Sequence, residues 1–145
     1  VPEPLELKTL ADGADGPVTF PLPGGFWEIT MTPPKSGSFP LPRDANAVLL
    51  TRDEVERCRF RTPLPGDRLR PFGAPGEKPL RRFLTDRRLD APLRPALWLL
   101  ADDHHILWIP GMVSSESLRR ASAQGLWRLC CRPVPCTGLS SDHKE

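Results

Sequence analysis

The sequence lacks the features that would place the protein across a membrane. Its 145 residues contain no apolar run near 18 residues, so no segment is long enough to span a bilayer as a helix. The N-terminal stretch VPEPLELKTL has no charged segment before an apolar core, and it therefore does not match a secretory signal peptide. Because no segment could span a bilayer, we expect no membrane partner. Because the first residue is Val and not Met, we expect a piece of a longer protein.

Cysteine is scarce, and its spacing fits no metal site. The four cysteines form no Cys-x-x-Cys pair, and the adjacent residues Cys130 and Cys131 cannot readily bind one tetrahedral ion together. His104 and His105 stand between two apolar segments with no third ligand nearby, which indicates turn residues. We therefore expect reduced thiols, no metal ion and a cytoplasmic location.

A catalytic site is also missing from the sequence. No nucleophile–base pair is apparent, and the cluster Asp102-Asp103-His104-His105 has no second cluster to work with. We therefore predict no catalytic residue in this chain, and an autonomous enzyme is the weakest functional class.

Proline and glycine, in contrast, are abundant. The 19 prolines and 11 glycines favour short strands joined by turns and argue against a helical bundle. Within residues 56–64, Cys58 and Phe60 are expected to face the core, and the alternating arginines the other side. The full set of predicted strands is two within 17–32, one at 47–50 before a charged turn, one within 56–64, a hairpin over 96–111 and a last strand over 125–134.

One helix is predicted, over residues 79–89. Leu80, Phe83 and Leu84 fall at positions i, i+3 and i+4, and Pro79 occupies a first-turn position. The predicted fold class is therefore α+β, a small and mainly antiparallel sheet domain with one main helix. We expect the apolar positions of these elements to share one core, formed by Phe60, Leu80, Phe83, Leu99, Ile106 and Trp108.

The charge of the chain is small overall but unevenly distributed. The formal net charge is +2, yet residues 57–88 hold ten basic against three acidic residues, a net charge of +7, which leaves −5 for the rest. Nine of the ten basic residues are Arg, whose planar guanidinium can bind a phosphate through two donors at once. The segment predicts either a basic face that attracts phosphates or a solvated surface without a partner.

The same segment carries a series of short motifs. They are Arg61, Pro65-Gly66-Asp67-Arg68, Pro71-Phe72-Gly73, Gly76-Glu77-Lys78-Pro79-Leu80, Phe83 to Asp86, Pro92 to Arg94 and Trp108-Ile109-Pro110-Gly111. In order and spacing, this series resembles the C-terminal domain of tRNA(Ile)-lysidine synthetase over residues 58–112. Residues 17–56 resemble, more weakly, the strand-rich segment that precedes that domain.

The resemblance implies a fold shared with a domain of the phenylalanyl-tRNA synthetase β-chain. Together with the composition, it divides the chain into four parts. These are a linker or frayed end at 1–16, the strand-rich segment at 17–56, a lysidine synthetase C-terminal-like domain at 57–134 and a polar tail at 135–145.

The resemblance also implies a role in tRNA modification. Enzymes of this family use ATP to adenylate the wobble cytidine of an isoleucine tRNA, and lysine then displaces AMP to give lysidine. That chemistry belongs to an N-terminal domain with a Ser-Gly-Gly-x-Asp-Ser phosphate loop, which this sequence lacks. We therefore expect no cofactor in this chain, ATP and magnesium in the parent enzyme, and two partners, the catalytic domain and tRNA.

Within the family, this domain grips the body of the tRNA near the acceptor stem. The residues predicted to bind RNA are Arg61, Arg68, Arg70, Lys78, Arg81 and Arg82. Asp67 is expected to cap a turn and orient Arg68. Phe72 either stacks on a base or, as we favour, belongs to the core, and Arg94 either binds phosphate or anchors its own turn. The alternative function is a stand-alone protein-interaction or structural module that keeps the fold.

Overall fold

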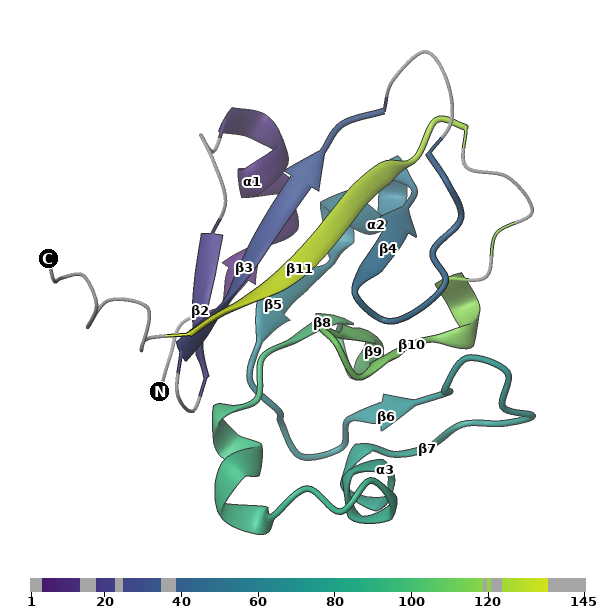
Figure 1. The fold of residues 1–145 in the computed structure, drawn as a ribbon. Helices are drawn as coiled ribbons and strands as arrows, with labels where there is room; N and C mark the ends of the chain where they lie inside the picture. Colours follow the sequence, from purple (N-terminus) through teal and green to yellow (C-terminus); the bar gives the residue numbers. More distant parts are fainter. Residues whose placement is uncertain are drawn as a thin grey trace, which may run out of the picture.

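Two β-sheets share a hydrophobic core, and a short helix covers the other face of the larger sheet (Figure 1). The computed structural model describes residues 4–13, 18–22, 25–34, 39–118, 120 and 124–135. The fold is of the predicted α+β class, with mainly antiparallel strands. None of the helices within the described residues is long and apolar enough to cross a membrane.

The smaller sheet has four antiparallel strands in the order β2-β3-β11-β4. Its strands are β2 (Val18–Leu22), β3 (Gly25–Thr32), β11 (Trp127–Pro135) and β4 (Ala47–Leu50), which confirms the strands predicted over 17–32, 47–50 and 125–134. The last strand, β11, lies between two strands from the first third of the chain. It pairs Leu129 with Met31 of β3 on one side and with Val48 of β4 on the other.

The larger sheet has seven strands, most of them very short. Its order is β1-β5-β8-β9-β6-β7, and β10 pairs with β9; only the β6–β9 pairing is parallel. The predicted hairpin over 96–111 is confirmed as β8 and β9, joined by a turn in which Asp103 has a φ of 57°. The strands are β1 (Leu5–Glu6), β5 (Arg59–Arg61), β6 (Arg68–Leu69), β7 (Lys78–Pro79), β8 (Leu99–Asp102), β9 (His105–Ile109) and β10 (Val113–Ser114).

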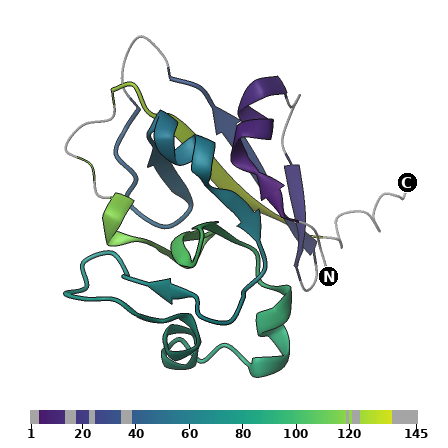
Figure 2. The ribbon, with the colours of Figure 1, turned by 180° about the vertical axis from the view of Figure 1, so that it is seen from behind.

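Helix α3 (Leu80–Asp86) confirms the predicted helix, although it is shorter than residues 79–89. Two further helices were not predicted: α1 (Leu7–Gly13) and α2 (Arg52–Arg57). Figure 2 shows both in front of the four-stranded sheet, on the side turned away from the viewer of Figure 1. Two 3-10 helices, η1 (Ala91–Ala96) and η2 (Glu116–Leu118), complete the described elements.

The prediction of a linker or frayed end at 1–16 is wrong for residues 5–13. Leu5 pairs with Phe60 at the edge of the larger sheet, and Leu7 is completely buried in the core. Residues 1–3 and 14–16 of that predicted end lie outside the described residues, as do residues 136–145 of the predicted tail.

The charged turn predicted after Ala47–Leu50 is in fact helix α2. Thr51 is its N-cap, and its side chain accepts a hydrogen bond from the Glu54 backbone nitrogen at 3.1 Å. The Glu54 carboxylate in turn accepts from the Thr51 nitrogen at 2.8 Å. This reciprocal capping box starts the helix, so the Thr-x-x-Glu spacing was the signal for it.

The expected single core is two clusters, one on each face of the β8–β9 hairpin. Phe60 and Trp108 belong to the cluster between the two sheets, whereas Phe83 and Ile106 belong to the cluster under α3. Leu99 and Leu100 explain the division, because neighbouring residues of a strand point to opposite faces and both are completely buried. The larger sheet is therefore covered on both sides at its centre.

Candidate nucleic-acid interface

Arg61 and Asp67 form a buried ion pair at the start of the basic segment. Arg61 Nη1 and Nη2 donate to Asp67 Oδ2 and Oδ1 at 2.9 and 2.8 Å, in the fork geometry of a two-donor Arg–carboxylate pair. The two side chains are only 5% and 1% exposed. Arg61 also donates to the carbonyl oxygens of Thr62 and Asp103, at 3.0 and 2.6 Å. The structure thus does not bring Arg61 to the surface, and we leave it out of the RNA-binding set.

Asp67 connects the loop before β6 to three other segments. Its carboxylate accepts from the Leu64 backbone nitrogen at 2.8 Å, and its carbonyl oxygen accepts from the Leu80 nitrogen at 2.9 Å, where α3 begins. His104 Nδ1, in the hairpin turn, lies 3.4 Å from Asp67 Oδ1. The expectation that Asp67 orients Arg68 is therefore wrong, because the Asp67 carboxylate binds Arg61 instead.

Helix α3 presents a row of exposed arginines. Its apolar positions are buried under the larger sheet, so Arg81 and Arg82 lie on the solvent side, and Arg87 and Arg88 follow at the C-terminal end of the helix. Among the residues that the structure describes, Arg81, Arg82 and Arg88 form no ion pair. The guanidinium of Arg87 lies over the Phe83 ring, 4.9 Å from its centroid.

Two further cations border α3, and each is paired with an acid. Arg68 Nε binds Glu77 Oε1 at 2.8 Å, and Lys78 Nζ binds Asp86 Oδ2 at 2.9 Å. The hydrogen bond from Lys78 lowers the pKa of the Asp86 carboxyl. We call the cations around this helix the α3 basic surface: Arg68, Lys78, Arg81, Arg82, Arg87 and Arg88.

Arg70, the remaining residue predicted to bind RNA, lies beyond this surface. It is exposed at the start of the turn after β6, and its Nε donates to the Ala74 carbonyl oxygen at 2.9 Å. Together with Arg68 it lines a separate cleft of about 480 Å³, in which Glu77 and Glu116 are also found. Arg70 therefore continues the basic surface into a region of mixed charge.

A different cleft, also of about 480 Å³, lies between α3 and the loop over residues 63–68. Arg81 and Leu84 contribute from the helix, and Arg94 contributes from η1. Arg94 Nε donates to the Leu89 carbonyl oxygen at 2.9 Å, and its Nη2 to Thr85 Oγ1 at 3.3 Å. Arg94 thus anchors its own turn and also faces the cleft.

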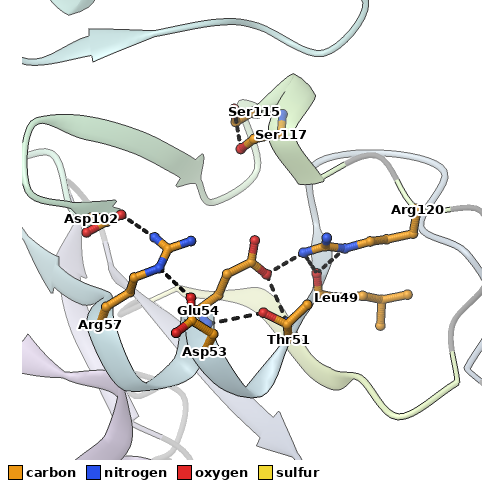
Figure 3. Close-up of polar contacts among 9 residues, drawn as sticks. All are labelled: Leu49, Thr51, Asp53, Glu54, Arg57, Asp102, Ser115, Ser117 and Arg120. Carbon is orange, nitrogen blue, oxygen red and sulfur yellow. Dashed lines mark hydrogen bonds and ion pairs between the residues drawn. The ribbon is translucent and has the colours of Figure 1, made fainter.

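The region around α2, whose Glu54 and Arg57 line the same cleft as Arg68 and Arg70, is also rich in arginine, but there the charges are paired (Figure 3). Arg57 binds Asp102 of β8 and donates from Nε to Asp53 Oδ2 at 3.0 Å. Chiefly because of the hydrogen bond to Asp53, the pKa of Arg57 lies above its ordinary value. A cation in such a network has little free capacity for an external anion.

The buried carboxylate of α2 has its own partner. Glu54 binds Arg120, which also donates to the Leu49 carbonyl oxygen at 3.2 Å from Nη2 (Figure 3). The Glu54 and Arg120 side chains are 9% and 17% exposed. This pair joins α2 to the chain beyond η2, so its role is structural.

The aromatic residues follow the predictions except at one position. Trp108 is buried, in agreement with its predicted core position; Trp98 is also buried, and Trp127 is half-buried. Phe72 was expected in the core, but its side chain is 46% exposed because it lies in the turn after β6.

The cysteines within the described residues are free thiols. Burial raises the pKa of Cys58 to about 12 and that of Cys131 to about 11, so both stay protonated near neutral pH. Cys136 lies outside the described residues. Within the described part of the chain, no group of three or more His, Cys, Asp and Glu side chains could hold a metal ion.

The sequence pattern of the TilS substrate C-terminal domain matches residues 57–131, more than half of the chain. The tRNA(Ile)-lysidine synthase of Symbiobacterium thermophilum is 31% identical over 105 residues, which cover 72% of this chain and 21% of the relative. The synthase of Shouchella clausii is 43% identical over 63 residues, 42% of this chain and 13% of the relative. The chain therefore spans about a fifth or less of these relatives.

A solved structure shows the same fold. The crystal structure of a TilS C-terminal domain superposes with a TM-score of 0.68 at 23% sequence identity, and the match covers 91% of this chain and 97% of that one. Sequence and fold thus agree over the segment that contains the buried Arg61–Asp67 pair and the arginines of α3. The chain belongs to the TilS substrate C-terminal domain family of the tRNA(Ile)-lysidine synthases.

Proposed function

We propose that this domain binds tRNA for a tRNA(Ile)-lysidine synthase, through the α3 basic surface. The observation that carries the proposal is the set of exposed arginines on α3 and just after it, of which Arg81, Arg82 and Arg88 form no ion pair among the described residues. These arginines fall within the segment that matches the family. Base-paired RNA is recognised mainly through phosphates, ribose hydroxyls and shape, which requires cations on a firm scaffold.

The scaffold for these arginines is the buried network beneath them. Asp67 ties the loop before β6 to the first residue of α3, and the apolar side of that helix is buried against the larger sheet. The backbone positions of Arg81 and Arg82 are therefore fixed before RNA arrives. Preordering of this kind lowers the entropy that binding must offset.

The proposal extends to the parent enzyme. The ligase that makes lysidine would carry ATP and magnesium in a separate catalytic domain, and this domain would hold the tRNA for it in the cytoplasm. The gripping site would lie near the acceptor stem, as the family resemblance implies. None of the chemical steps is assigned to residues of this chain.

The test is the salt dependence of tRNA binding by the Arg81→Ala, Arg82→Ala double variant. Losing two phosphate contacts should weaken binding at low salt by at least about tenfold. The slope of log affinity against log salt concentration should flatten by about one unit per contact. A fluorescence titration of labelled tRNA at several salt concentrations measures both.

The matched control is Arg52→Ala, on the α2 side. Arg52 is exposed, but its Nε is paired with Glu56 Oε2 at 3.1 Å. Its loss should leave the tRNA salt slope unchanged. If the double variant binds like the wild type, with the same slope, the α3 basic surface is only solvated and the domain has a structural or protein-binding role.

A further inference from the structure

The cleft between α3 and the 63–68 loop is lined by apolar groups as well as by cations. One wall consists of Pro63, Leu64 and Pro65, and the buried Leu84 of the helix borders the other. Leu64 is 49% exposed, so its side chain is accessible to a ligand in the cleft. A phosphate group alone would gain nothing from this wall.

The apolar wall is held rigidly. The Leu64 backbone nitrogen donates to the buried Asp67 carboxylate at 2.8 Å, and the Asp67 nitrogen donates back to the Leu64 carbonyl oxygen at 3.2 Å. The prolines on both sides fix their own φ angles. The cleft is thus already formed in the free protein.

Part of the charged lining is available to an anion, whereas Arg68, which also lines the cleft, is paired with Glu77 at 2.8 Å. Arg81 has no ion-pair partner among the described residues, and Arg94 uses Nε and Nη2 for its own turn, which leaves Nη1 without a hydrogen-bond partner there. The only acid in the lining, Asp67, is neutralised by its buried pair with Arg61. A ligand of this cleft therefore needs both an anionic group and an apolar or planar part.

We propose that the cleft receives one unpaired nucleotide of the bound RNA. Its phosphate would lie toward Arg81 and Arg94, and its base or ribose against Leu64 and the flanking prolines. This inference rests on the proposed function and adds a single-stranded contact to it. The volume of about 480 Å³ is in the range of small-ligand sites.

A base-paired nucleotide cannot fill this role. In an RNA duplex the bases are stacked inside, and only the backbone and groove edges reach a protein surface. Unpaired nucleotides can turn out, and their bases then pack against side chains and guanidinium planes. The apolar wall distinguishes the cleft from the rest of the α3 basic surface, which a duplex backbone can satisfy.

The test compares Arg81→Ala with Arg82→Ala. These residues are neighbours on α3, and both are exposed and without an ion pair in the described structure, but only Arg81 lines the cleft. Calorimetric titrations would use a short single-stranded RNA, a blunt-ended RNA duplex of equal charge, and AMP. Arg81→Ala should weaken binding of the single strand by about tenfold, and more than it weakens binding of the duplex, whereas Arg82→Ala should weaken both by the same smaller factor.

Leu64→Ala gives a second readout, because an exposed side chain can be shortened without unfolding the domain. The change should weaken binding of AMP and of the single strand, and should leave binding of inorganic phosphate unaltered. The single strand should also displace AMP from the wild-type cleft.

Equal losses of single-strand binding in the two arginine variants, or an unchanged affinity of Leu64→Ala for AMP, would overturn the proposal. AMP binding that the single strand fails to displace would assign the cleft to a free nucleotide instead, and would also overturn it. The duplex tests the proposed function separately, because salt-independent duplex binding refutes the basic surface whatever happens in the cleft.

Discussion

The two arginine-rich sides of this domain differ in how their charges are balanced. Around α2, Arg52, Arg57 and Arg120 each have an acidic partner. On α3, Arg81 and Arg82 form no ion pair within the described residues. The number of arginines therefore does not distinguish the two regions, whereas the number of arginines without an ion-pair partner does.

The same comparison separates structural from exposed arginines within the basic segment itself. Arg61 and Arg68 are only seven positions apart, yet the first is 5% exposed in its pair and the second 47%. A buried charge that loses its partner stays without solvation by water, whereas an exposed charge is solvated. Substitutions on the two kinds of site should therefore have separable effects on stability and on RNA binding.

The largest expected effect is on stability, from Arg61→Ala. This change leaves Asp67 buried without its cation and should lower the free energy of unfolding by about 3–5 kcal/mol. Urea denaturation measures the loss, and Arg81→Ala is the control, with an expected change within about 0.5 kcal/mol. Equal free energies of unfolding in the two variants would mean that the buried pair does not stabilise the fold.

Arg120→Ala should have an intermediate effect on the α2 side. It removes the partner of Glu54 and the bonds to Leu49, in a position that is less deeply buried than Arg61. We expect a loss of about 1–3 kcal/mol in the free energy of unfolding, with no change in the salt slope of tRNA binding. A flattened slope would place the α2 side in the RNA interface and remove the distinction between the two sides.

Glu77→Gln should remove the ion pair of Arg68 and leave its guanidinium without an acidic partner. The Arg68–Glu77 pair is exposed, so its loss should cost little stability, while one acid disappears from the α3 basic surface. We expect tRNA affinity at low salt to rise by about twofold to fivefold. Glu56→Gln on α2 is the matched control and should leave affinity unchanged; a fall in affinity with Glu77→Gln would show instead that Glu77 orients Arg68 for RNA.

The smallest effect should be seen at Asp86. Lys78 lowers the pKa of this carboxyl, so the pair stabilises the fold above the ordinary pKa of an aspartate and loses its effect as pH falls through the folded-state value. In Lys78→Met, the pKa of Asp86 should rise toward its ordinary value. Carboxyl-carbon NMR titration measures this shift, and an unchanged pKa would mean that the 2.9 Å contact does not persist in solution.

The local elements of the fold were predictable from the sequence because their signals are local. The β8–β9 hairpin follows from two apolar segments around a polar turn, and α3 from the spacing of Leu80, Phe83 and Leu84. Helix α2 also has a local signal, the capping pair Thr51 and Glu54, although the charged residues between them are equally typical of a turn. Strand β1 had none, because two residues become a strand only through pairing with β5.

The candidate site was predictable as a segment but not residue by residue. Composition located the excess of arginine, and α-helical periodicity placed Arg81 and Arg82 outside. The burial of Arg61 could not be predicted from its position in an alternating strand. Its partner Asp67 lies six residues later, and only the folding of the intervening loop brings the two side chains together. The cleft depends on three separate segments meeting, and no spacing in the sequence records that.

The placement of β11 between β3 and β4 has a consequence for how the chain folds. Its pairings join Leu129 to Met31 and Val48, positions that are far apart in the sequence. Contacts of such long range are entropically costly to close and slow the folding of small domains. During synthesis, β3 and β4 must wait for the last strand with open hydrogen-bonding edges, and such edges invite pairing with other chains. We therefore expect the early strands to be the segment most prone to misassembly until residue 135 has been made.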